Sequence, residues 1–249
     1  MTLNNTLKLI RKLKQKKYRK DTKLFVAEGR KIIKELLNSD FRIHTILTTE
    51  QEAQNINVKT NTKLIISDYQ IITKVSHLQT PQPILAIVEQ KQWNLSIANP
   101  QKELILTLDN IQDPGNFGTI VRLANWFGIK LIVASPDCVD IYNSKTVQAT
   151  MGALFHTPVV YYPLNEYLHK ANTLIYGTFL NGEKLSNAQL TKYGIILMGN
   201  EANGIRQELK DMVNIKLYIP YFGTSKHVES LNVAMATAIV LWEFKQQSI

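Results

Sequence analysis

The chain has 249 residues, enough for one large domain or two small ones, and a formal net charge of +9. No apolar stretch approaches the roughly 20 residues of a membrane helix, and the N-terminus lacks the continuous apolar core of a secretion signal, so we expect a cytoplasmic protein with no membrane partner. The single cysteine, Cys138, excludes an intrachain disulfide. No nucleophile signature surrounds it, which favours an inert thiol, and the histidines show no metal-ligand spacing, so we expect no metal.

The positive charge is concentrated in residues 8–20, KLIRKLKQKKYRK, which contain eight lysines or arginines and no acid. Such a segment can neutralise several phosphates and release their counterions, so nucleic acid is the favoured partner. A solvated helix face is the second interpretation. A membrane-surface helix is the third, because only Leu9, Ile10 and Leu13 are apolar. The predicted RNA contacts are Lys12, Lys16, Lys17, Arg19 and, further along, Arg30.

Up to about residue 90, strand-like runs alternate with amphipathic helices. We expect strands at KLFVAEG, RIHTILTT, KLIIS and ILAIVEQ, and helices at GRKIIKELLNS and DYQIITKVS. The stretch 90–101, QKQWNLSIANPQ, is polar and aperiodic, as linkers are. We therefore predict a first part, residues 1–95, that joins the basic segment to a small α/β domain.

A second α/β pattern begins after this linker. Strands are expected at ELILTLD, KLIVAS, PVVYY, TLIYGTF, GIILMG and KLYIP. Helices are expected at NFGTIVRLANWFG, NSKTVQATMGALF, LNEYLHKA, GIRQELKDM and SLNVAMATAIVLWEFK. Strands that are apolar throughout and separated by helices predict a mostly parallel sheet with helices on both faces, here over residues 96–249.

Ligands of such sheets bind where strands end and loops lead into helices, and the first polar loop of this kind is PGNFGTIVRLANWFG at 114–128. We expect a helix from about Phe117 to Phe127, with Asn116 as its N-cap and Arg122 turned away from its apolar stripe. The Gly-x-Gly-x-x-Gly spacing of dinucleotide-binding loops is absent. A capping asparagine and a solvated arginine are the structural alternative to a functional site.

The second loop, MGNEANGI at 198–205, places Glu201 between Gly199 and Gly204, although it could be an ordinary turn. The third lies in IPYFGTSKHVESLNVAMATAIVLWEF at 219–244, where Ser230 is the expected N-cap of the last helix and Asn232 belongs to its first turn. That helix is apolar nearly all round, which predicts burial in the core or in a subunit interface.

In this order the three loops resemble the three motifs of the SpoU/TrmH family of RNA 2′-O-methyltransferases, in the SPOUT superfamily. The matching segments are Asn116–Arg122, Gly199–Gly204 and Ser230–Ala234, within a resemblance that covers about residues 102–249. Residues 20–90 look like the small substrate-binding domain of rRNA-modifying members. The resemblance implies methyl transfer from S-adenosyl-L-methionine to a ribose 2′-hydroxyl of ribosomal RNA, with 23S rRNA favoured, and also a deep C-terminal trefoil knot and a homodimer.

Two alternatives stay open, a tRNA ribose methyltransferase of the same family and an RNA-binding protein without activity. The resemblance also implies functional residues. The catalytic set is Arg122, Asn116, Glu201, Ser230 and Asn232. The cofactor-binding set is Gly199, Ile219, Leu231, Thr178 and Gly204.

Arg122 is the residue that the resemblance implies will activate the 2′-hydroxyl. Because arginine stays charged in proteins, we expect it to stabilise the alkoxide more readily than it accepts a proton. The loop between Pro220 and Ser230 carries Lys226, His227 and Glu229, and we interpret it as a charged surface insertion at the rim of the cofactor site.

Overall fold

The computed structural model describes residues 2–58, 62–224 and 229–247. The chain separates into two compact units. The first consists of Met1–Gln92 together with Asp140–His156, and the second of Trp93–Val139 together with Thr157–Ile249. Each unit has its own sheet, so they are described one after the other.

The first unit contains a mixed four-stranded sheet in the order β1-β4-β2-β3 within the described residues. β4 pairs antiparallel with both β1 and β2, while β3 runs parallel to β2. The strands lie where the apolar runs predicted them, at β1 (Leu24–Glu28), β2 (Ile43–Thr48), β3 (Lys63–Ile66) and β4 (Ile84–Glu89). The helices are α1 (Leu3–Leu13), α2 (Lys16–Thr22), α3 (Arg30–Leu37), α4 (Glu50–Ala53), α5 (Tyr69–Thr73) and α7 (Ser144–Thr150), followed by the 3-10 turn η2 (Ala153–Phe155).

The basic segment forms α1 and α2, and only one side of α1 is apolar. Ile10 and Leu13 are buried and pack against residues of the sheet, among them Val26 and Leu47. An amphipathic helix of this kind buries its apolar stripe and leaves the opposite face in water. The lysines of the segment therefore lie at the surface, because they do not share that stripe.

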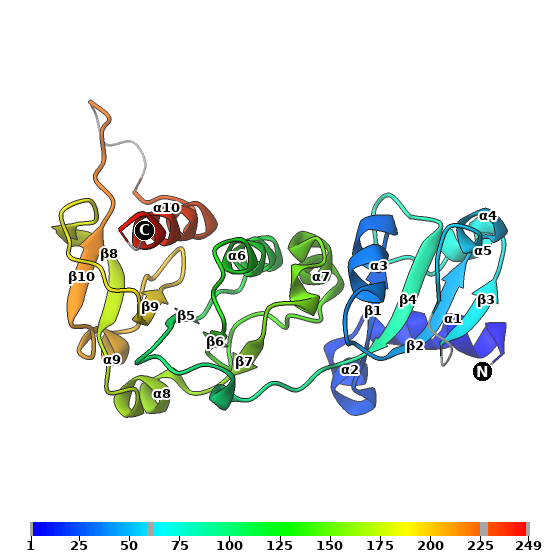
Figure 1. Cartoon of the computed structure of the whole chain (residues 1–249). Helices are drawn as coiled ribbons and strands as arrows, with labels where there is room; N and C mark the ends of the chain where they lie inside the picture. The colour runs from blue at the N-terminus through cyan, green and yellow to red at the C-terminus, as the bar shows by residue number, and fades with distance from the viewer. Residues whose placement is uncertain (1, 59–61, 225–228, 248–249) are drawn as a thin grey trace. The chain divides into compact units, whose positions relative to one another are not determined.

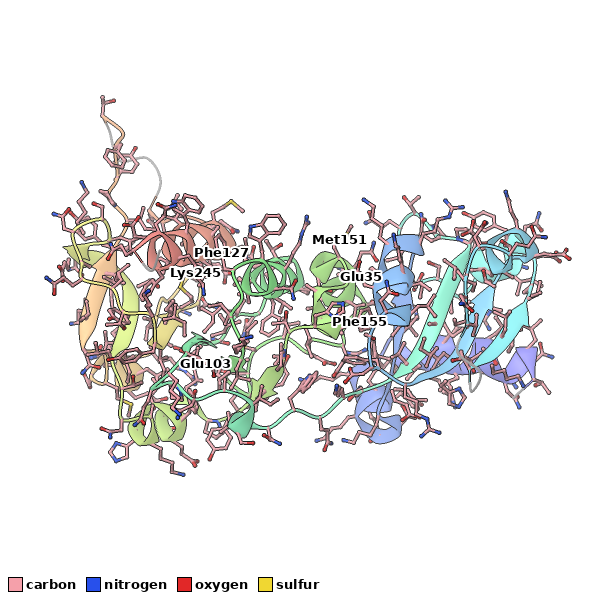
Figure 2. The ribbon with its side chains drawn as sticks, viewed as in Figure 1. Glu35, Glu103, Phe127, Met151, Phe155 and Lys245 are labelled. Carbon is pink, nitrogen blue, oxygen red and sulfur yellow. The ribbon has the colours of Figure 1, made fainter. Side chains whose placement is uncertain are left out.

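The segment 140–156 returns the chain to the first unit. Tyr142 packs on Phe25 with 4.5 Å between ring centroids, and Phe155 meets Phe41 edge to face at 5.1 Å. Figure 2 labels Phe155 of this segment beside Glu35 of α3, whose carboxylate lies 3.2 Å from His156 Nε2. Sequence patterns gave no sign of this return, since α7 reads like any other helix between two strands.

The second unit contains a six-stranded sheet in the order β10-β8-β9-β5-β6-β7, and within the described residues every neighbouring pair is parallel. This confirms the predicted parallel sheet. Figure 1 shows α6 and α10 on one face and α8 and α9 on the other. The strands are β5 (Leu104–Leu108), β6 (Ile132–Ala134), β7 (Val159–Tyr161), β8 (Ile175–Lys184), β9 (Gly194–Met198) and β10 (Ile215–Tyr218). The helices are α6 (Pro114–Trp126), α8 (Leu164–Lys170), α9 (Gln207–Lys210) and α10 (Val233–Gln246), with the 3-10 turn η1 (Leu95–Ile97) before β5.

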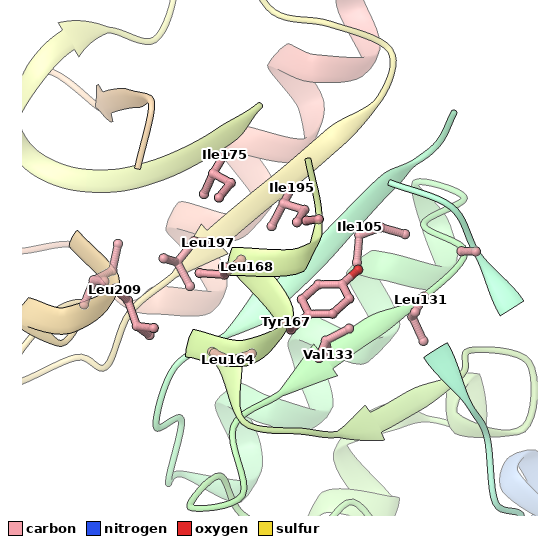
Figure 3. Packing of buried hydrophobic residues seen from close by; sticks show 13 residues of the cluster. Ile105, Leu131, Val133, Leu164, Tyr167, Leu168, Ile175, Ile195, Leu197 and Leu209 are labelled. Carbon is pink, nitrogen blue, oxygen red and sulfur yellow. The ribbon is translucent and has the colours of Figure 1, made fainter. Parts of the chain in front are cut away.

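The central strands are buried on both faces, which explains their unbroken apolar sequence. On the α8 side, Ile195 and Leu197 of β9 pack with Leu164 and Leu168 of α8 (Figure 3). Full burial of one such side chain contributes about 1.5–3 kcal/mol. No helix among the described residues is long and apolar enough to cross a membrane.

Candidate active site at the ends of the parallel strands

A cavity of about 410 Å³ lies in the second unit beside the middle of β8, where β9 and β10 lead into loops and α10 begins. Its size falls within the range of small-molecule sites. Glu201 and Ser230, predicted as catalytic residues, contribute to its lining. So do all of the residues predicted to bind a cofactor: Gly199, Ile219, Leu231, Thr178 and Gly204.

One wall of this cavity is a tight turn after β9. The backbone amides of Asn200 and Gly204 donate to each other's carbonyl oxygens at 3.0 and 2.9 Å. Gly204 has φ +66°, a conformation that suits glycine. A Cβ at Gly199 would lie 2.4 Å from both the carbonyl carbon of Gly204 and the nitrogen of Ile205. The turn therefore excludes any side chain at position 199, so bare backbone lines the cavity there.

Asn200 fixes this turn to the neighbouring strand. Its Nδ2 donates to the carbonyl of Asn110, just beyond β5, at 2.7 Å, and its Oδ1 accepts from the amide of Ala202 at 2.9 Å. No role for Asn200 was predicted from the sequence. The available signal was a side chain that can donate and accept hydrogen bonds inside a glycine-bounded turn.

An ion pair between a buried aspartate and a half-buried arginine fixes the same loop from its far end. The carboxylate of Asp109 is fully buried and accepts from Arg206 Nε at 2.7 Å and from the Arg206 backbone amide at 2.8 Å. Arg206 Nη1 also lies 3.4 Å from Asp137. The sequence did not predict this pair, because an acid at the end of an apolar strand and an arginine 97 residues later share no local pattern.

Helix α6 begins earlier than predicted, and Asn116 is not its N-cap. The helix begins at Pro114, and Asp113 is the cap, whose carboxylate accepts from the Asn116 amide at 2.7 Å. Proline suits the first helical position because its missing N–H would have no helical partner there. The Asn116 side chain therefore does not cap the helix.

The side chain of Asn116 instead joins two other predicted site residues. Its Nδ2 donates to Glu201 Oε1 at 2.6 Å, and its Oδ1 accepts from Asn232 Nδ2 at 2.9 Å. The three residues come from α6, the loop after β9 and the start of α10. One hydrogen-bonded chain therefore connects the three motif loops beside the cavity.

The start of α10 also differs from the prediction. Asn232 is the N-cap, accepting from the amides of Ala234 and Met235 at 2.9 and 3.3 Å, and the helix begins at Val233. Ser230 lies two residues before the cap, exposed, in the lining of the cavity. Lys226 and His227 of the preceding loop lie outside the described residues.

Arg122 is exposed on α6, six residues beyond Asn116. At 100° per residue the two side chains leave the helix about 120° apart. Among the described residues, Arg122 is not part of the cavity lining. Within one chain the structure therefore brings together Asn116, Glu201 and Asn232, with Ser230 nearby, and leaves Arg122 apart from them.

Helix α10 is apolar nearly all round, as expected, but only one side of it is buried within the chain. Thr237, Val240 and Phe244 lie on its buried side. Met235, Ile239 and Trp242, at successive helical turns on the other side, are 53%, 41% and 55% exposed. The helix was predicted to be buried in the core or in a subunit interface. The core of this chain covers only one of its faces.

The predicted RNA contacts of the first unit fall into two groups. Lys12, Lys16 and Lys17 are exposed on α1 and α2, and Arg30 is exposed at the start of α3. Arg19 is different, because its side chain is only 3% exposed and its guanidinium donates to Asp140 and to two backbone carbonyls. The prediction for Arg19 is corrected: its donors hold the fold together and do not face a phosphate.

Cys138 is buried, and burial raises the pKa of its thiol, which suits an inert residue. Its Sγ accepts from the Ile111 amide at 3.2 Å. No group of three or more His, Cys, Asp or Glu residues within the described ranges could hold a metal ion. The expectation of a metal-free protein stays a prediction.

The cavity lies at the carboxyl ends of strands in a parallel α/β sheet, and a glycine turn and polar side chains bound it. These features are typical of α/β enzymes that bind a small ligand at this edge of the sheet. The sequence profile of the SpoU rRNA Methylase family matches residues 103–242, and that of the MRM3-like substrate binding domain matches residues 4–86. The chain belongs to the SpoU rRNA methylase family, which confirms the resemblance seen in its motifs.

Two relatives and one solved structure illustrate the similarity. The 23S rRNA (guanosine(2553)-2′-O)-methyltransferase RlmP of Bacillus subtilis is 30% identical over 97% of this chain and 96% of its own. The 23S rRNA (guanosine-2′-O-)-methyltransferase RlmB of Neisseria meningitidis is 26% identical over 91% of this chain and 87% of its own. The AdoMet-bound rRNA methyltransferase of Sinorhizobium meliloti superimposes with a TM-score of 0.87 at 31% identity, over 100% of this chain and 97% of that one.

Proposed function

We propose that this protein transfers a methyl group from S-adenosyl-L-methionine to a ribose 2′-hydroxyl of ribosomal RNA, with 23S rRNA as the favoured substrate. The observation that carries the proposal is the hydrogen-bonded chain Asn232–Asn116–Glu201 beside a cavity walled by a side-chain-free glycine turn. The similarity to RlmP and RlmB over most of the chain supports ribosomal RNA as the substrate. We place this activity in the cytoplasm.

The cavity fits the chemistry of this cofactor. Its lining includes the aliphatic side chains of Leu217 and Val240, which suit a flat adenine ring, and the hydroxyl of Ser230, which suits polar groups of a ribose or an amino acid. At Gly199 a ligand can approach the backbone closely, since no side chain intervenes. When bound, S-adenosyl-L-methionine supplies an electrophilic methyl group on a sulfonium.

The task of the protein's own residues is to hold the acceptor hydroxyl in line with that methyl group. Asn116 suits this positioning role, because its amide is fixed from both sides. After these two hydrogen bonds the amide keeps one N–H and one lone pair for substrate. We propose that Arg122, which one chain leaves apart from these residues, stabilises the developing alkoxide and contacts the adjacent phosphate once RNA is bound, as a permanent cation can.

We also propose that the protein acts as a homodimer through α10. The exposed apolar stripe of Met235, Ile239 and Trp242, together with Trp126 of α6, which is 83% exposed, supports an interface in which these side chains leave water. The deep trefoil knot implied by family resemblance is part of the same proposal. Light scattering tests the dimer: the wild-type chain should have twice the monomer mass, and Trp242→Glu should shift it toward the monomer mass. A monomeric wild type would contradict the proposal.

The activity is tested by a ribose-methylation map of ribosomal and transfer RNA from cells with and without the gene. The expected result is one 23S rRNA position that loses its methyl group, whereas loss at a tRNA position would favour a tRNA methyltransferase. Calorimetric titration with S-adenosyl-L-methionine separates enzyme from RNA-binding protein, because no detectable binding would favour the latter. Arg122→Lys should reduce turnover with RNA binding retained, and near-normal turnover would remove Arg122 from its proposed role.

A further inference from the structure

The first unit contains a second cavity, of about 620 Å³, which none of the proposed catalytic steps uses. It lies between α3 and the residues that follow α4, and Ile84 of β4 contributes to its lining. Its size is within the range of small-ligand sites. Its lining combines an apolar wall with a cationic and amide rim.

The apolar wall comes from both sides of the cavity. Ile33 and Leu37 are four residues apart on α3 and therefore share a helical face. Ile56 and Val58, after α4, also line the cavity. All four are aliphatic, and a wall of this kind suits a flat, weakly hydrated group such as a nucleobase.

Arg30 stands at the rim of this cavity with its guanidinium held along one edge. Its Nε donates to Glu52 Oε2 at 2.9 Å and its Nη2 to Glu52 Oε1 at 2.5 Å, while the side chain is 63% exposed. A two-point pairing fixes the plane of a guanidinium and leaves its faces available for stacking, as arginines do with unpaired bases. Glu52 is buried, so the fold fixes the position of the carboxylate that holds Arg30.

The charge of the rim favours an anion. Both carboxylate oxygens of Glu52 are engaged by Arg30, so the pair is neutral, and Lys34, exposed one turn along α3, leaves the cavity with net positive charge. Asn55 and Asn57 line the same cavity and supply amide groups, which can both donate to and accept from base edges.

We propose that this cavity binds one unpaired nucleotide of the RNA substrate, with the base between the apolar wall and the Arg30 guanidinium and a phosphate beside Lys34. The inference rests on the proposed function, since it assumes that RNA is the substrate. A base held in this way would anchor a loop or bulge of the RNA, the kind of element that proteins read in RNA. Stacking tolerates any base, so stacking in this cavity anchors the RNA but does not by itself select a sequence.

The test compares Lys34→Glu with Lys31→Glu in the full chain. Both residues are exposed on α3, but among the described residues only Lys34 lines the cavity. Binding of a short labelled single-stranded RNA is measured by fluorescence anisotropy. The Kd for this RNA should be roughly ten times higher in K34E than in K31E, because the RNA phosphate beside position 34 loses its lysine partner. Equal losses in the two variants would overturn the inference.

A second measurement maps the contact directly. With the same RNA carrying 4-thiouridine, photocrosslinks should fall on the peptides that contain Arg30 and residues 55–58. Crosslinks confined to the α1–α2 peptides would overturn the inference. Arg30→Lys keeps the charge but not the planar fork, so it should also weaken RNA binding, while circular dichroism reports whether the fold is retained.

The outcomes also separate this inference from the proposed function. Titration with S-adenosyl-L-methionine should give the same Kd for wild type, K34E and K31E. If wild type binds the cofactor and methylates ribosomal RNA while K34E and K31E bind RNA equally, only the nucleotide site is wrong. If wild type binds no cofactor, the proposed function fails whatever the RNA data show. Equal binding of naked RNA by K34E and K31E would overturn the inference even if K34E lost binding to the ribosome.

Discussion

Replacing Gly199 by alanine tests whether the turn after β9 shapes the cofactor site. The added Cβ would lie 2.4 Å from two backbone atoms, whereas ordinary contacts of a Cβ begin at 3.4 Å. Relief of that overlap requires the turn to open by about 1 Å, and overpacking of this kind costs about 1–3 kcal/mol. The two hydrogen bonds between Asn200 and Gly204 would weaken as well, at about 1 kcal/mol each.

The turn is a wall of the cavity, so opening it should also weaken cofactor binding. We expect the calorimetric Kd of Gly199→Ala for S-adenosyl-L-methionine to rise at least about tenfold, which corresponds to about 1.4 kcal/mol. Gly128→Ala is the matched control: its φ is +65°, but a Cβ there meets no described atom within 4 Å. G128A should lose about 1 kcal/mol of stability and no cofactor affinity. Unchanged affinity in G199A would refute the argument that the turn must be free of side chains.

Three further substitutions test other parts of the structure. Arg19→Met removes the guanidinium that pairs with the mostly buried Asp140 carboxylate and donates to two backbone carbonyls. Urea unfolding should therefore show a loss of about 3 kcal/mol, against little change for the exposed neighbour variant Lys20→Met. Asn116→Ala removes the centre of the hydrogen-bonded chain, so kcat should fall about 100-fold, while the cofactor Kd, set by other residues, stays near wild type. Burial, with nearby Lys14 and Arg19, lowers the pKa of His77, so the unfolded chain takes up a proton there more readily than the folded chain. Wild type should therefore lose stability relative to His77→Gln as pH falls below about 6.5. Parallel curves of stability against pH would contradict this.

Strands could be predicted from the sequence because burial on both faces requires unbroken apolar runs. The residues of β5 and β9, for example, are all buried, and each run ends at a polar or glycine residue that begins a loop. Helix starts were less predictable. Asp113 and Asn116 are both good N-caps by residue type, and Pro114 between them decides the matter, because proline fits the first helical position.

Contacts between distant segments left no pattern in the sequence. Arg19 sits in a run of lysines and looks like a phosphate contact, yet its carboxylate partner is 121 residues away. Arg30 of α3 and Glu52 of α4 are separated by 22 residues, and only the fold brings them into contact. Local composition reports the charge of a side chain, but its burial depends on which segment folds over it. This is why one predicted RNA contact became a structural residue.

Asn232 shows how the fold and the site impose joint requirements on one residue. Its Oδ1 caps α10 by accepting from two backbone amides, and its Nδ2 donates to Asn116 Oδ1 at 2.9 Å. Aspartate would cap the helix but has no N–H to donate, and serine would cap it with a side chain one atom shorter. Asparagine supplies both groups from a single rigid amide. Since the cap orients that amide before any substrate arrives, the start of α10 also sets the orientation of Asn116, and through it that of the Glu201 carboxylate.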